Sequence, residues 1–569
     1  MINDLKDKDA FCDNQPILQG GSIQAFGLMV VLDFSFKILQ VSANAEKFFG
    51  CRCDQVVGKN LADFLSAEDY RFLQQEIKNG DMSNFCGFNL TVKTATGLKS
   101  LPASFCVFEK YWIVELEWAD EKMDFVAILK IRNRISKLIL NFKQYRTLQE
   151  MSDATAAELR STLGMDKVMV YRFDENWHGT VLSESKESAM EAYLGLRFPA
   201  TDIPAPARQL YAINPIRMIP NINDALVPLE PVLNPLTGEF SDMRTCILRG
   251  VASVHLEYLK NMQVCTSISV SIIKNSVLWG LIAFHHRSPK TMHVEIRSAL
   301  RILEESFSAR LMILESYESK EQIAGVADFR KTLTASALRE DAPLTPIRDQ
   351  IETVSRSLDA QGAAIYFDEQ WFEWGVVPQR AQLQKLMEWL QKKKNQAVYS
   401  TDFLSQEYLE GETIKDVASG LLAISVAGQF EDFVLWFRPE VVQTVKWGGD
   451  PGQTLHFGSA NKTYHPRKSF EIWKETVRGH AVSWKASEKS AAAEIRQMLA
   501  DDLLRFRSAK LKTISGILPI CASCKKIRDE KNSWEVLELY IEKRSKAEFS
   551  HGICPDCYKK ALEDAGIKK

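Results

Sequence analysis

The stretch that decides the fold is Arg197-Phe-Pro-Ala-Thr-Asp-Ile-Pro204. Its two prolines fix φ and remove two backbone N–H groups, so the segment cannot continue a helix or a central strand. A single carboxylate, Asp202, lies between them on a stiff loop whose backbone carbonyl groups we expect to be free to accept hydrogen bonds. Such a loop suits a buried ligand with several N–H donors. The alternative interpretation is an ordinary surface turn.

The composition is that of a multidomain globular protein. The chain has 569 residues, enough for three or four domains, and 46% of them are hydrophobic and 25% charged. The formal net charge of −2 argues against a general surface for polyanions, so nucleic acid is not an expected partner. No apolar run approaches the ~20 residues of a membrane span, and the N-terminus lacks the apolar core of a signal peptide. Eleven cysteines, an odd number, favour reduced thiols and a cytoplasmic protein.

Three regions of mixed helix and strand follow one another. Residues 27–50 are expected to form strand, turn, strand and a short helix that ends at Gly50, and strand-like runs continue to about residue 118. Apolar strands at 167–173, 266–273 and 278–284 predict a second domain over about 135–290. A third region spans about 330–490. The expected fold class is α+β.

Two long helices are expected, one over about 294–335 and one that carries Ile495 and leads into the last 55 residues. In both, apolar residues recur at 3/4 spacing on a single face. In the first helix these residues are Leu300, Leu303, Phe307, Leu311 and Leu314, and in the second Ile495, Leu499, Leu503 and Phe506. Such a stripe is usually core, but a helix of this length can also be an inter-domain spine or the seam of a dimer.

The proline loop, Cys12 near the N-terminus and two motifs farther along, Trp447-Gly-Gly449 and Pro466-Arg-Lys-Ser-Phe470, together resemble the bacteriophytochromes. The resemblance covers about residues 10–490 and implies tandem PAS, GAF and PHY domains. We expect a PAS domain with an attachment segment over 1–120, a GAF chromophore-binding domain over 121–320, a PHY domain over 321–505, and a small C-terminal module with four cysteines over 506–569.

The resemblance implies a covalently bound biliverdin. In the family, the cysteine that corresponds to Cys12 forms a thioether to a vinyl group of this linear tetrapyrrole. Plant and many cyanobacterial relatives attach their bilin through a GAF-domain cysteine just before a histidine, and here that position is Val254, before His255. The chain therefore resembles the biliverdin class.

The resemblance also implies the rest of the pocket. Arg217 and Arg249 match the arginines that hold the two propionates, for which the guanidinium fork is well suited. His255 matches the histidine beside the pyrrole nitrogens and His285 the one at the D-ring carbonyl, and we expect both to titrate near neutrality. A lone histidine or arginine is otherwise a core or surface residue. The remaining matched residues are Tyr171, Phe198, Ile203, Pro204, Tyr211, Tyr258 and Ser267.

The tongue of the PHY domain is the predicted switch. The resemblance assigns to it Trp447, Gly448 and Gly449 in one arm, and Pro466, Arg467 and Ser469 in the other. In the family this hairpin seals the bilin pocket and refolds from sheet toward helix after illumination. Arg467 would pair with Asp202 in one state and Ser469 would replace it in the other. The alternative is a static β-hairpin with a salt bridge.

The tail carries Cys521-Ala-Ser-Cys524 and Cys554-Pro-Asp-Cys557, two pairs separated by 29 residues. Four thiolates at this spacing suit tetrahedral Zn²⁺, with His551 near enough to replace one thiolate or to bond to it. The alternative, two thioredoxin-like dithiols, lacks a surrounding βαβ unit. The segment resembles a short C-terminal module of bacterial sensory and response-regulator proteins.

The sequence thus predicts a red/far-red photoreceptor that isomerises biliverdin and signals by conformational change. The expected partners are a second copy of the chain, through the long helices, and a downstream protein such as a response regulator or a separate kinase. No enzyme is expected, because too few residues follow position 490 for a kinase or cyclase domain. Two alternatives stay open: a bilin- or haem-binding sensor or scaffold without a photocycle, whose zinc module binds protein or nucleic acid, and a thiol–disulfide exchange enzyme. The dark-stable photostate is not decided by these motifs.

Overall fold

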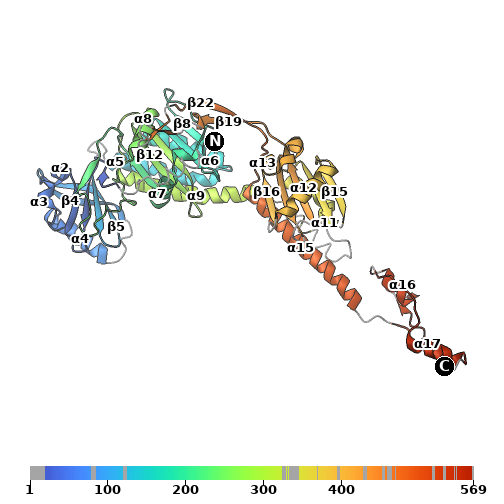
Figure 1. Cartoon of the computed structure of the whole chain (residues 1–569). Coiled ribbons are helices and arrows are strands. Elements are labelled where there is room, and N and C mark those ends of the chain that lie inside the picture. Colours follow the sequence, from blue (N-terminus) through green and yellow to red (C-terminus); the bar gives the residue numbers. More distant parts are fainter. Residues whose placement is uncertain are drawn as a thin grey trace. The chain divides into compact units, whose positions relative to one another are not determined.

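The protein is described by a computed structural model that divides into two compact units (Figure 1). The first contains residues 1–323, 402–419 and 439–482, and the second contains 324–401, 420–438 and 483–569. The structure describes residues 20–78, 85–118, 125–322, 329, 331, 345–367, 369–393, 397–426, 432–451, 455–457, 464–467, 469–515, 520–528, 533–543, 545 and 547–566. The predicted attachment residue Cys12 lies outside them.

The first sheet has seven strands in the order β1-β11-β3-β2-β6-β5-β4. Its strands are β1 (Ser22–Ile23), β2 (Gly27–Leu32), β3 (Ile38–Ser42), β4 (Phe85–Thr94), β5 (Gly97–Val107), β6 (Trp112–Glu117) and β11 (Val227–Glu230), with helices α2 (Ala45–Phe49), α3 (Cys53–Val56) and α4 (Ala67–Lys78). Strand β2 is buried on both faces, since Leu28 and Val30 belong to the core of this layer while Met29 and Val31 belong to the core of the next domain. Strand β11 lies in the sequence of the second domain, which is built around the second sheet, so strands of both domains form the first sheet.

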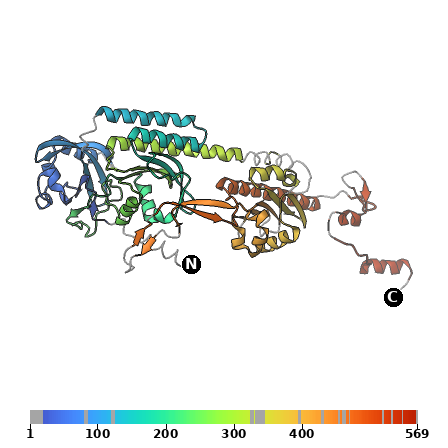
Figure 2. The same ribbon diagram turned by 90° about the horizontal axis from the view of Figure 1, so that it is seen from above.

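The second sheet has the order β10-β12-β13-β7-β8-β9-β19-β22. Its strands are β7 (Lys167–Phe173), β8 (Gly179–Lys186), β9 (Arg197–Phe198), β10 (Ile216–Ile219), β12 (Thr266–Lys274), β13 (Val277–His286), β19 (Gln443–Gly448) and β22 (Ile472–Val477). Helices α5 (Phe125–Asn141), α6 (Leu148–Leu163) and α9 (Val294–Gln322) lie side by side against one face (Figure 2). The side chains that alternate to the other face, Ser267 and His285 among them, lie on the same side as α7 (Ala205–Ile213), where Ser271 donates to the carbonyl of Tyr211.

The apolar stripe of the first long helix is core. Leu300, Leu303, Phe307 and Leu311 are fully buried in the first unit, together with the strands that they cover. This outcome follows from the 3/4 spacing, which places all of them on one face of α9. A seam between two chains would therefore have to use other faces of the helices.

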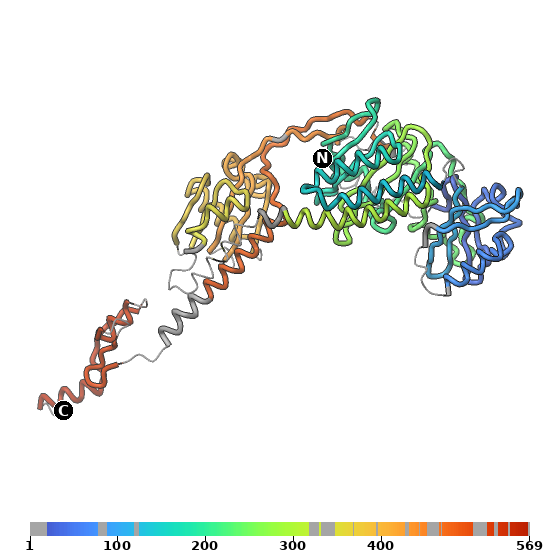
Figure 3. Tube along the Cα trace, turned by 180° about the vertical axis from the view of Figure 1, so that it is seen from behind, coloured from blue at the N-terminus to red at the C-terminus, as the bar shows by residue number. Residues whose placement is uncertain are grey.

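Strands β19 and β22 form a long hairpin within residues 439–482, seen as the paired orange strands in Figure 3. They pair antiparallel from Gln443 opposite Val477 to Gly448 opposite Ile472, and Trp447 pairs in parallel with Arg197 of β9. Near its tip, β20 (Leu455–Phe457) pairs with β21 (Tyr464–Pro466). The short helices α13 (Leu404–Glu407) and α14 (Lys415–Ala418) belong to the same unit.

The second unit contains a five-stranded antiparallel sheet in the order β15-β14-β18-β17-β16. Its strands are β14 (Gly362–Phe367), β15 (Gln370–Gly375), β16 (Val398–Thr401), β17 (Gly420–Ser425) and β18 (Phe433–Arg438), with helices α11 (Thr345–Ser357), α12 (Arg380–Lys392) and α15 (Ala486–Ser515). Every residue of β17 and β18 is buried. The tail adds β23 (Ile527–Arg528), β24 (Trp534–Glu535), α16 (Leu537–Glu542) and α17 (Pro555–Asp564).

Arg438 ties this sheet to α15. Its Nη2 donates to Glu488 Oε1 at 2.9 Å and to the carbonyl of Leu358 at 2.8 Å, and its guanidinium lies 3.8 Å from the ring centre of Trp484. Both charged side chains are at most 4% exposed. Glu488 is the buried partner of this guanidinium, and Asp359, which is exposed, lies 3.9 Å from the same Nη2. Burial makes the pairing of the Glu488 carboxylate with Arg438 important for stability.

We expect Arg438→Met to lower the free energy of unfolding of the second unit by about 3 kcal/mol, because it leaves the Glu488 carboxylate buried without its partner. Urea titration followed by tryptophan fluorescence measures the change. The matched control is Arg356→Met, which removes an exposed ion pair with Glu352 on α11 and should cost less than about 1 kcal/mol. Equal effects of the two substitutions would contradict the prediction.

Candidate functional site

The loop over residues 197–204 leaves the sheet and opens a helix, as its prolines require. Pro199 begins a single 3₁₀ turn over Ala200–Asp202, and Pro204 has a φ of −63° at the start of α7. The carbonyl groups of Pro199, Ala200, Ile203 and Pro204 are not free, contrary to the expectation from sequence. Arg208 Nη1 donates to the carbonyl of Ile203 at 2.6 Å and to that of Ala200 at 3.3 Å. Arg208, which lies one turn into the following helix, thus holds the loop in place through these two hydrogen bonds. No sequence motif indicated this contact.

A cavity lies beside this loop and encloses about 1080 Å³ of empty space, part of which is open to solvent. Its walls come from the loop, from α7, from β10, from residues 249–258 and from Pro466 of the hairpin. The predicted residues on these walls are Asp202, Ile203, Pro204, Tyr211, Arg217, Arg249, His255, Tyr258 and Pro466. Thr201 lines the cavity, and its buried Oγ1 has no partner within the described ranges; it was not predicted from sequence although it lies inside the decisive loop.

The other predicted pocket residues lie next to these walls. Tyr171 and Phe198 pack together, with ring centres 6.1 Å apart, in a small core that also holds Tyr258. Ser267 on β12 is directly opposite His285 on β13. The structure therefore brings every predicted pocket residue that it describes to one region of the first unit.

Two guanidinium groups line the cavity with unused hydrogen-bond donors. Arg217 Nη2 donates to the carbonyl of Gly250 at 2.9 Å, but its Nη1 and the Nε of Arg249 are buried and have no partner among the described residues. Burial, together with the charge of Arg249, lowers the pKa of Arg217 to about 9, and burial also lowers that of Arg249. Buried cations without partners fit an anionic ligand, whose carboxylates would satisfy both.

The two histidines are neutral in this pocket. Burial and the nearby charge of Arg217 lower the pKa of His255, on α8 (Ser253–Asn261), to about 4. Burial and the charge of Lys167 lower the pKa of His285 to about 3, and its Nδ1 has no partner in the described structure. The expectation that they titrate near neutrality is therefore wrong for the ligand-free pocket. Each neutral imidazole can donate to a ligand through one nitrogen and accept through the other.

The Asp202 carboxylate joins the loop to the hairpin. It accepts from Tyr258 Oη at 2.8 Å and from Nη2 of Arg467, and the side chains of Arg467 and Asp202 are only 3% and 6% exposed. Burial alone would lower the pKa of Arg467, but the carboxylate of Asp202 raises it, so the guanidinium stays charged. Arg467 also donates to the carbonyl of Gly448, and Asn261 on α8 donates to the carbonyl of Arg467 at 3.0 Å.

Glycine is required where the hairpin meets the loop. A Cβ at Gly448 would lie 2.7 Å from the ring of Phe198, and Gly449 has a φ of +89° with the carbonyl oxygen of Ser469 2.4 Å from the place of a Cβ. Trp447 Nε1 donates to Glu475 at 2.7 Å. Ser469, the residue predicted to exchange with Arg467, is exposed and its Oγ accepts from the N–H of Glu471.

The tail cysteines are not gathered into a metal site in the part of the chain that the structure describes; there, the one group of three such ligands close enough to share an ion is elsewhere. The pKa of the first thiol of each pair is nevertheless lowered by hydrogen bonds from the backbone. The backbone N–H of Cys524 lowers the pKa of Cys521, and that of Cys557 lowers the pKa of Cys554, whose Sγ accepts this N–H at 3.4 Å at the start of α17. The zinc site stays a prediction.

Family models match three successive parts of the chain: a PAS fold over residues 12–119, a GAF domain over 147–313 and a phytochrome region over 326–508. The chain is 35% identical to cyanobacterial phytochrome B of Nostoc over 496 residues, which are 87% of this chain and 66% of that protein. It is 30% identical to a bacteriophytochrome of Pseudomonas aeruginosa over 489 residues, or 86% of this chain and 66% of that protein. The chain spans 64–66% of the length of the cyanobacterial relatives that it matches.

Solved phytochrome structures have a similar fold. The crystal structure of bacteriophytochrome RpBphP3 from R. palustris superposes with a TM-score of 0.78 at 31% identity, over 87% of this chain and 99% of that one. The photosensory core module of the Stigmatella aurantiaca phytochrome gives the same TM-score at 32% identity, over 87% and 98%. The fold and the site define a photosensory module with PAS, GAF and PHY domains. The chain belongs to the phytochrome family.

These matches confirm the α+β fold class and the recognition of the PAS, GAF and PHY domains. Among the described helices, none combines the length and the apolar character that crossing a membrane requires.

The neutral state of the pocket histidines predicts a pH dependence of stability in the ligand-free protein. Between the ordinary histidine pKa of 6.5 and the pKa of about 4 of His255, the unfolded chain binds a proton that the folded chain does not. The free energy of unfolding should therefore fall as the pH drops through this window. His255→Gln should flatten the dependence, measured as urea midpoints at about pH 7.5 and about pH 5. The exposed His551→Gln serves as control and should keep the wild-type slope.

Proposed function

We propose that this protein is a red/far-red light sensor that binds biliverdin in the cavity of its GAF domain. The observation that carries the proposal is a pair of buried guanidinium donors on the wall of one cavity, Arg217 Nη1 and Arg249 Nε, which have no partner in the described structure. The Nδ1 of His285, which also has no partner there, lies next to this wall. A linear tetrapyrrole offers two propionates and a terminal carbonyl that match them. When bound, such a pigment absorbs red light and isomerises about a double bond. Matches to phytochromes over most of the chain support the same proposal.

The role of each residue follows from its place on the wall. Arg217 and Arg249 hold the propionates, and neutral His255 bonds near the pyrrole nitrogens together with the loop that carries Asp202. His285 bonds to the D-ring carbonyl. The rings of Tyr171, Phe198, Tyr211 and Tyr258, with Ser267, exclude water from the pigment, because apolar and aromatic walls around a few polar groups define such pockets.

We infer that Cys12 attaches the pigment. Its thiol would add across a vinyl group, so that sulfur bonds to carbon and the thiol proton passes to the neighbouring carbon, without any oxidant. The described end of this segment is anchored close to the cavity. Gln24 donates from its backbone to the carbonyl of Leu248 at 2.8 Å and from Nε2 to those of Met218 at 3.0 Å and Arg249 at 3.2 Å. Cys12 precedes Gln24 by twelve residues, a span of up to about 40 Å, so the thiol can reach a ligand beside Arg249.

The hairpin of residues 439–482 is the proposed tongue and switch. Its contact with the cavity depends on the Asp202–Arg467 pair, with Pro466 on the wall itself. Rotation of the D-ring beside Tyr171 and His285 would weaken this pair, and Ser469, now exposed, would take the place of Arg467. The backbone freedom of Gly448 and Gly449 suits such a rearrangement.

The output that we propose acts through a protein partner, to which the three matched sensory domains would pass the signal. A response regulator or a separate kinase fits this role, in the cytoplasm.

A homodimer would use exposed apolar side chains of α5 and α9, since the buried stripe of α9 is unavailable. They are Phe125, Val126, Leu129, Leu140, Ile302, Met312, Ile313 and Tyr317. The tail thiols are proposed to bind Zn²⁺, supported by the thiolate-favouring N–H groups at Cys521 and Cys554.

The experiment that tests the function is a difference spectrum of the full chain loaded with biliverdin. We expect a red-absorbing band that shifts on illumination and returns in darkness or under far-red light. A pigment that binds but shows no reversible shift would contradict the light-sensor function and favour a bilin- or haem-binding sensor or scaffold. A protein that stays colourless would contradict the pocket assignment as well.

Cys12→Ser tests the attachment separately. Wild-type protein should keep its pigment after denaturation in acidic urea, as zinc-induced fluorescence of the denatured band detects, whereas the variant should release it. Cys51→Ser, at a partly buried thiol of the PAS domain, is the matched control and should keep the pigment. Retention of the pigment by the Cys12 variant would place the attachment at another residue.

A further inference from the structure

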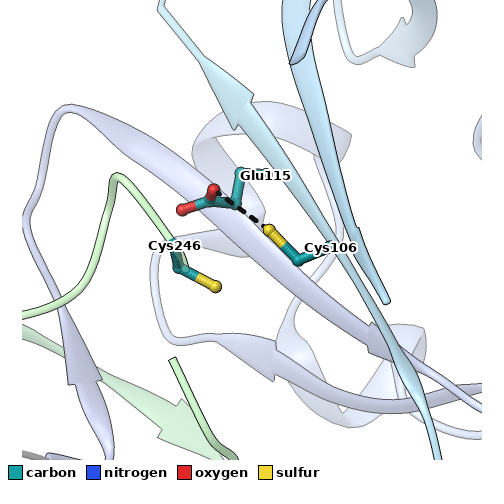
Figure 4. A group of neighbouring side chains, drawn as sticks. All are labelled: Cys106, Glu115 and Cys246. Atoms are coloured by element: carbon teal, nitrogen blue, oxygen red, sulfur yellow. Dashed lines mark hydrogen bonds between the residues drawn. The ribbon is translucent and has the colours of Figure 1, made fainter. Parts of the chain in front are cut away.

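Two cysteines and a glutamate, none of which lines the cavity, meet where the PAS domain adjoins the GAF domain (Figure 4). Cys106 lies on β5 and Glu115 on the neighbouring β6. Glu115 is directly opposite Ser104, and Cys106 follows Ser104 by two residues, so Cys106 and Glu115 lie on the same face of the sheet. Cys246 comes from the GAF segment that leads into Arg249. The two sulfur atoms and a carboxylate oxygen all lie within 4.8 Å of one another, and each residue is 1% exposed.

The glutamate is already oriented by its neighbours. Glu115 Oε1 accepts from the N–H of Leu248 at 2.7 Å, and Oε2 accepts from the N–H of Ile247 at 3.1 Å and from Ser104 Oγ at 3.2 Å. Such bonds fix the direction of a carboxylate and stabilise its charged form, as the outer partners of metal ligands do. Two further oxygens are close, Ser104 Oγ and the carbonyl of Thr245, which lies 4.0 Å from Cys106 Sγ.

No positively charged side chain of the described residues forms an ion pair with this cluster. The neighbouring carboxylate of Glu117 is paired with Arg297, whereas no ion pair of the described residues reaches Glu115. A divalent ion would release the two thiol protons to solvent and balance the charge of the thiolates.

We propose that Cys106, Glu115 and Cys246 bind one thiophilic divalent cation, with Zn²⁺ as the natural occupant. Two thiolates and one carboxylate are a ligand set that zinc accepts, with Ser104 Oγ or the carbonyl of Thr245 as a fourth oxygen. The separations of up to 4.8 Å place an ion slightly beyond ideal bond lengths, so the ligands close in by a few tenths of an ångström. The ion joins the PAS sheet to the segment that carries Arg249 into the bilin pocket.

The test uses the full chain with the four tail cysteines replaced by serine, so that the tail thiols cannot contribute. After purification with Zn²⁺ and removal of loose metal, this background should retain one equivalent, measured by elemental analysis. Co²⁺ in place of Zn²⁺ should show a thiolate-to-cobalt charge-transfer band. Adding Cys246→Ser should abolish both signals. Adding Cys265→Ser instead, at a buried GAF thiol outside the cluster, should leave both unchanged.

Binding of biliverdin by each variant shows that the domains are folded, which separates loss of the metal from loss of the fold. Retention of the metal by the Cys246 variant would overturn the site. The site would also be overturned if the protein with the four tail substitutions contained no metal. Peptide mapping without reduction would then show either a disulfide between Cys106 and Cys246 or two free thiols. A variant that cannot fold is replaced by Cys106→Ala, for which the same loss of metal is expected. The result does not depend on light sensing or on zinc in the tail.

Discussion

The structure of the site depends on one buried ion pair, Asp202 with Arg467. Removing two charges from water is unfavourable, and their attraction compensates only when the remaining hydrogen-bonding groups are also satisfied. Here Tyr258 donates to the carboxylate and the carbonyl of Gly448 accepts from the guanidinium, while the buried Nε of Arg467 has no partner among the described residues. Because the two charges belong to segments 265 positions apart in sequence, the hairpin and the loop are held together or released together. The ion pair and its hydrogen bonds form or break together. Such an interaction is suited to switching between two discrete states, one with the hairpin bound to the loop and one with it released.

The apolar contacts around this pair make the closed arrangement specific. Phe470 is buried against Tyr258, with ring centres 5.1 Å apart, and Phe198 closes over Gly448 so tightly that no side chain fits there. Any movement that separates Arg467 from Asp202 must also expose these rings. The cost of exposing them, roughly 1.5–3 kcal/mol for each large apolar side chain, adds to the cost of the unpaired charges and keeps the hairpin in place without a stimulus.

The sequence predicted most of the site, but for two different reasons. The helical spacing of Leu300, Leu303 and Phe307 predicts a buried face from local periodicity alone, and the structure has it. Asp202, Arg217 and His255 were brought together only through a family resemblance, since no spacing rule links a loop, a strand and a helix so far apart. The low pKa values of the histidines and the brace at Arg208 depend on burial and on contacts that no motif encodes.

The joint between PAS and GAF domains shows why such features escape sequence reasoning. Glu115 on the PAS sheet accepts two backbone N–H groups from the segment just before Arg249, and Gln24 holds the same segment through the carbonyl of Arg249. The pocket arginine is thus positioned by residues that precede it by more than a hundred positions. Cys106, Glu115 and Cys246 are unremarkable in sequence, and only the shared burial of two domains gives them a common chemistry. The described part of the PAS domain therefore contributes to the geometry of the anion-binding wall, although none of its residues lines the cavity.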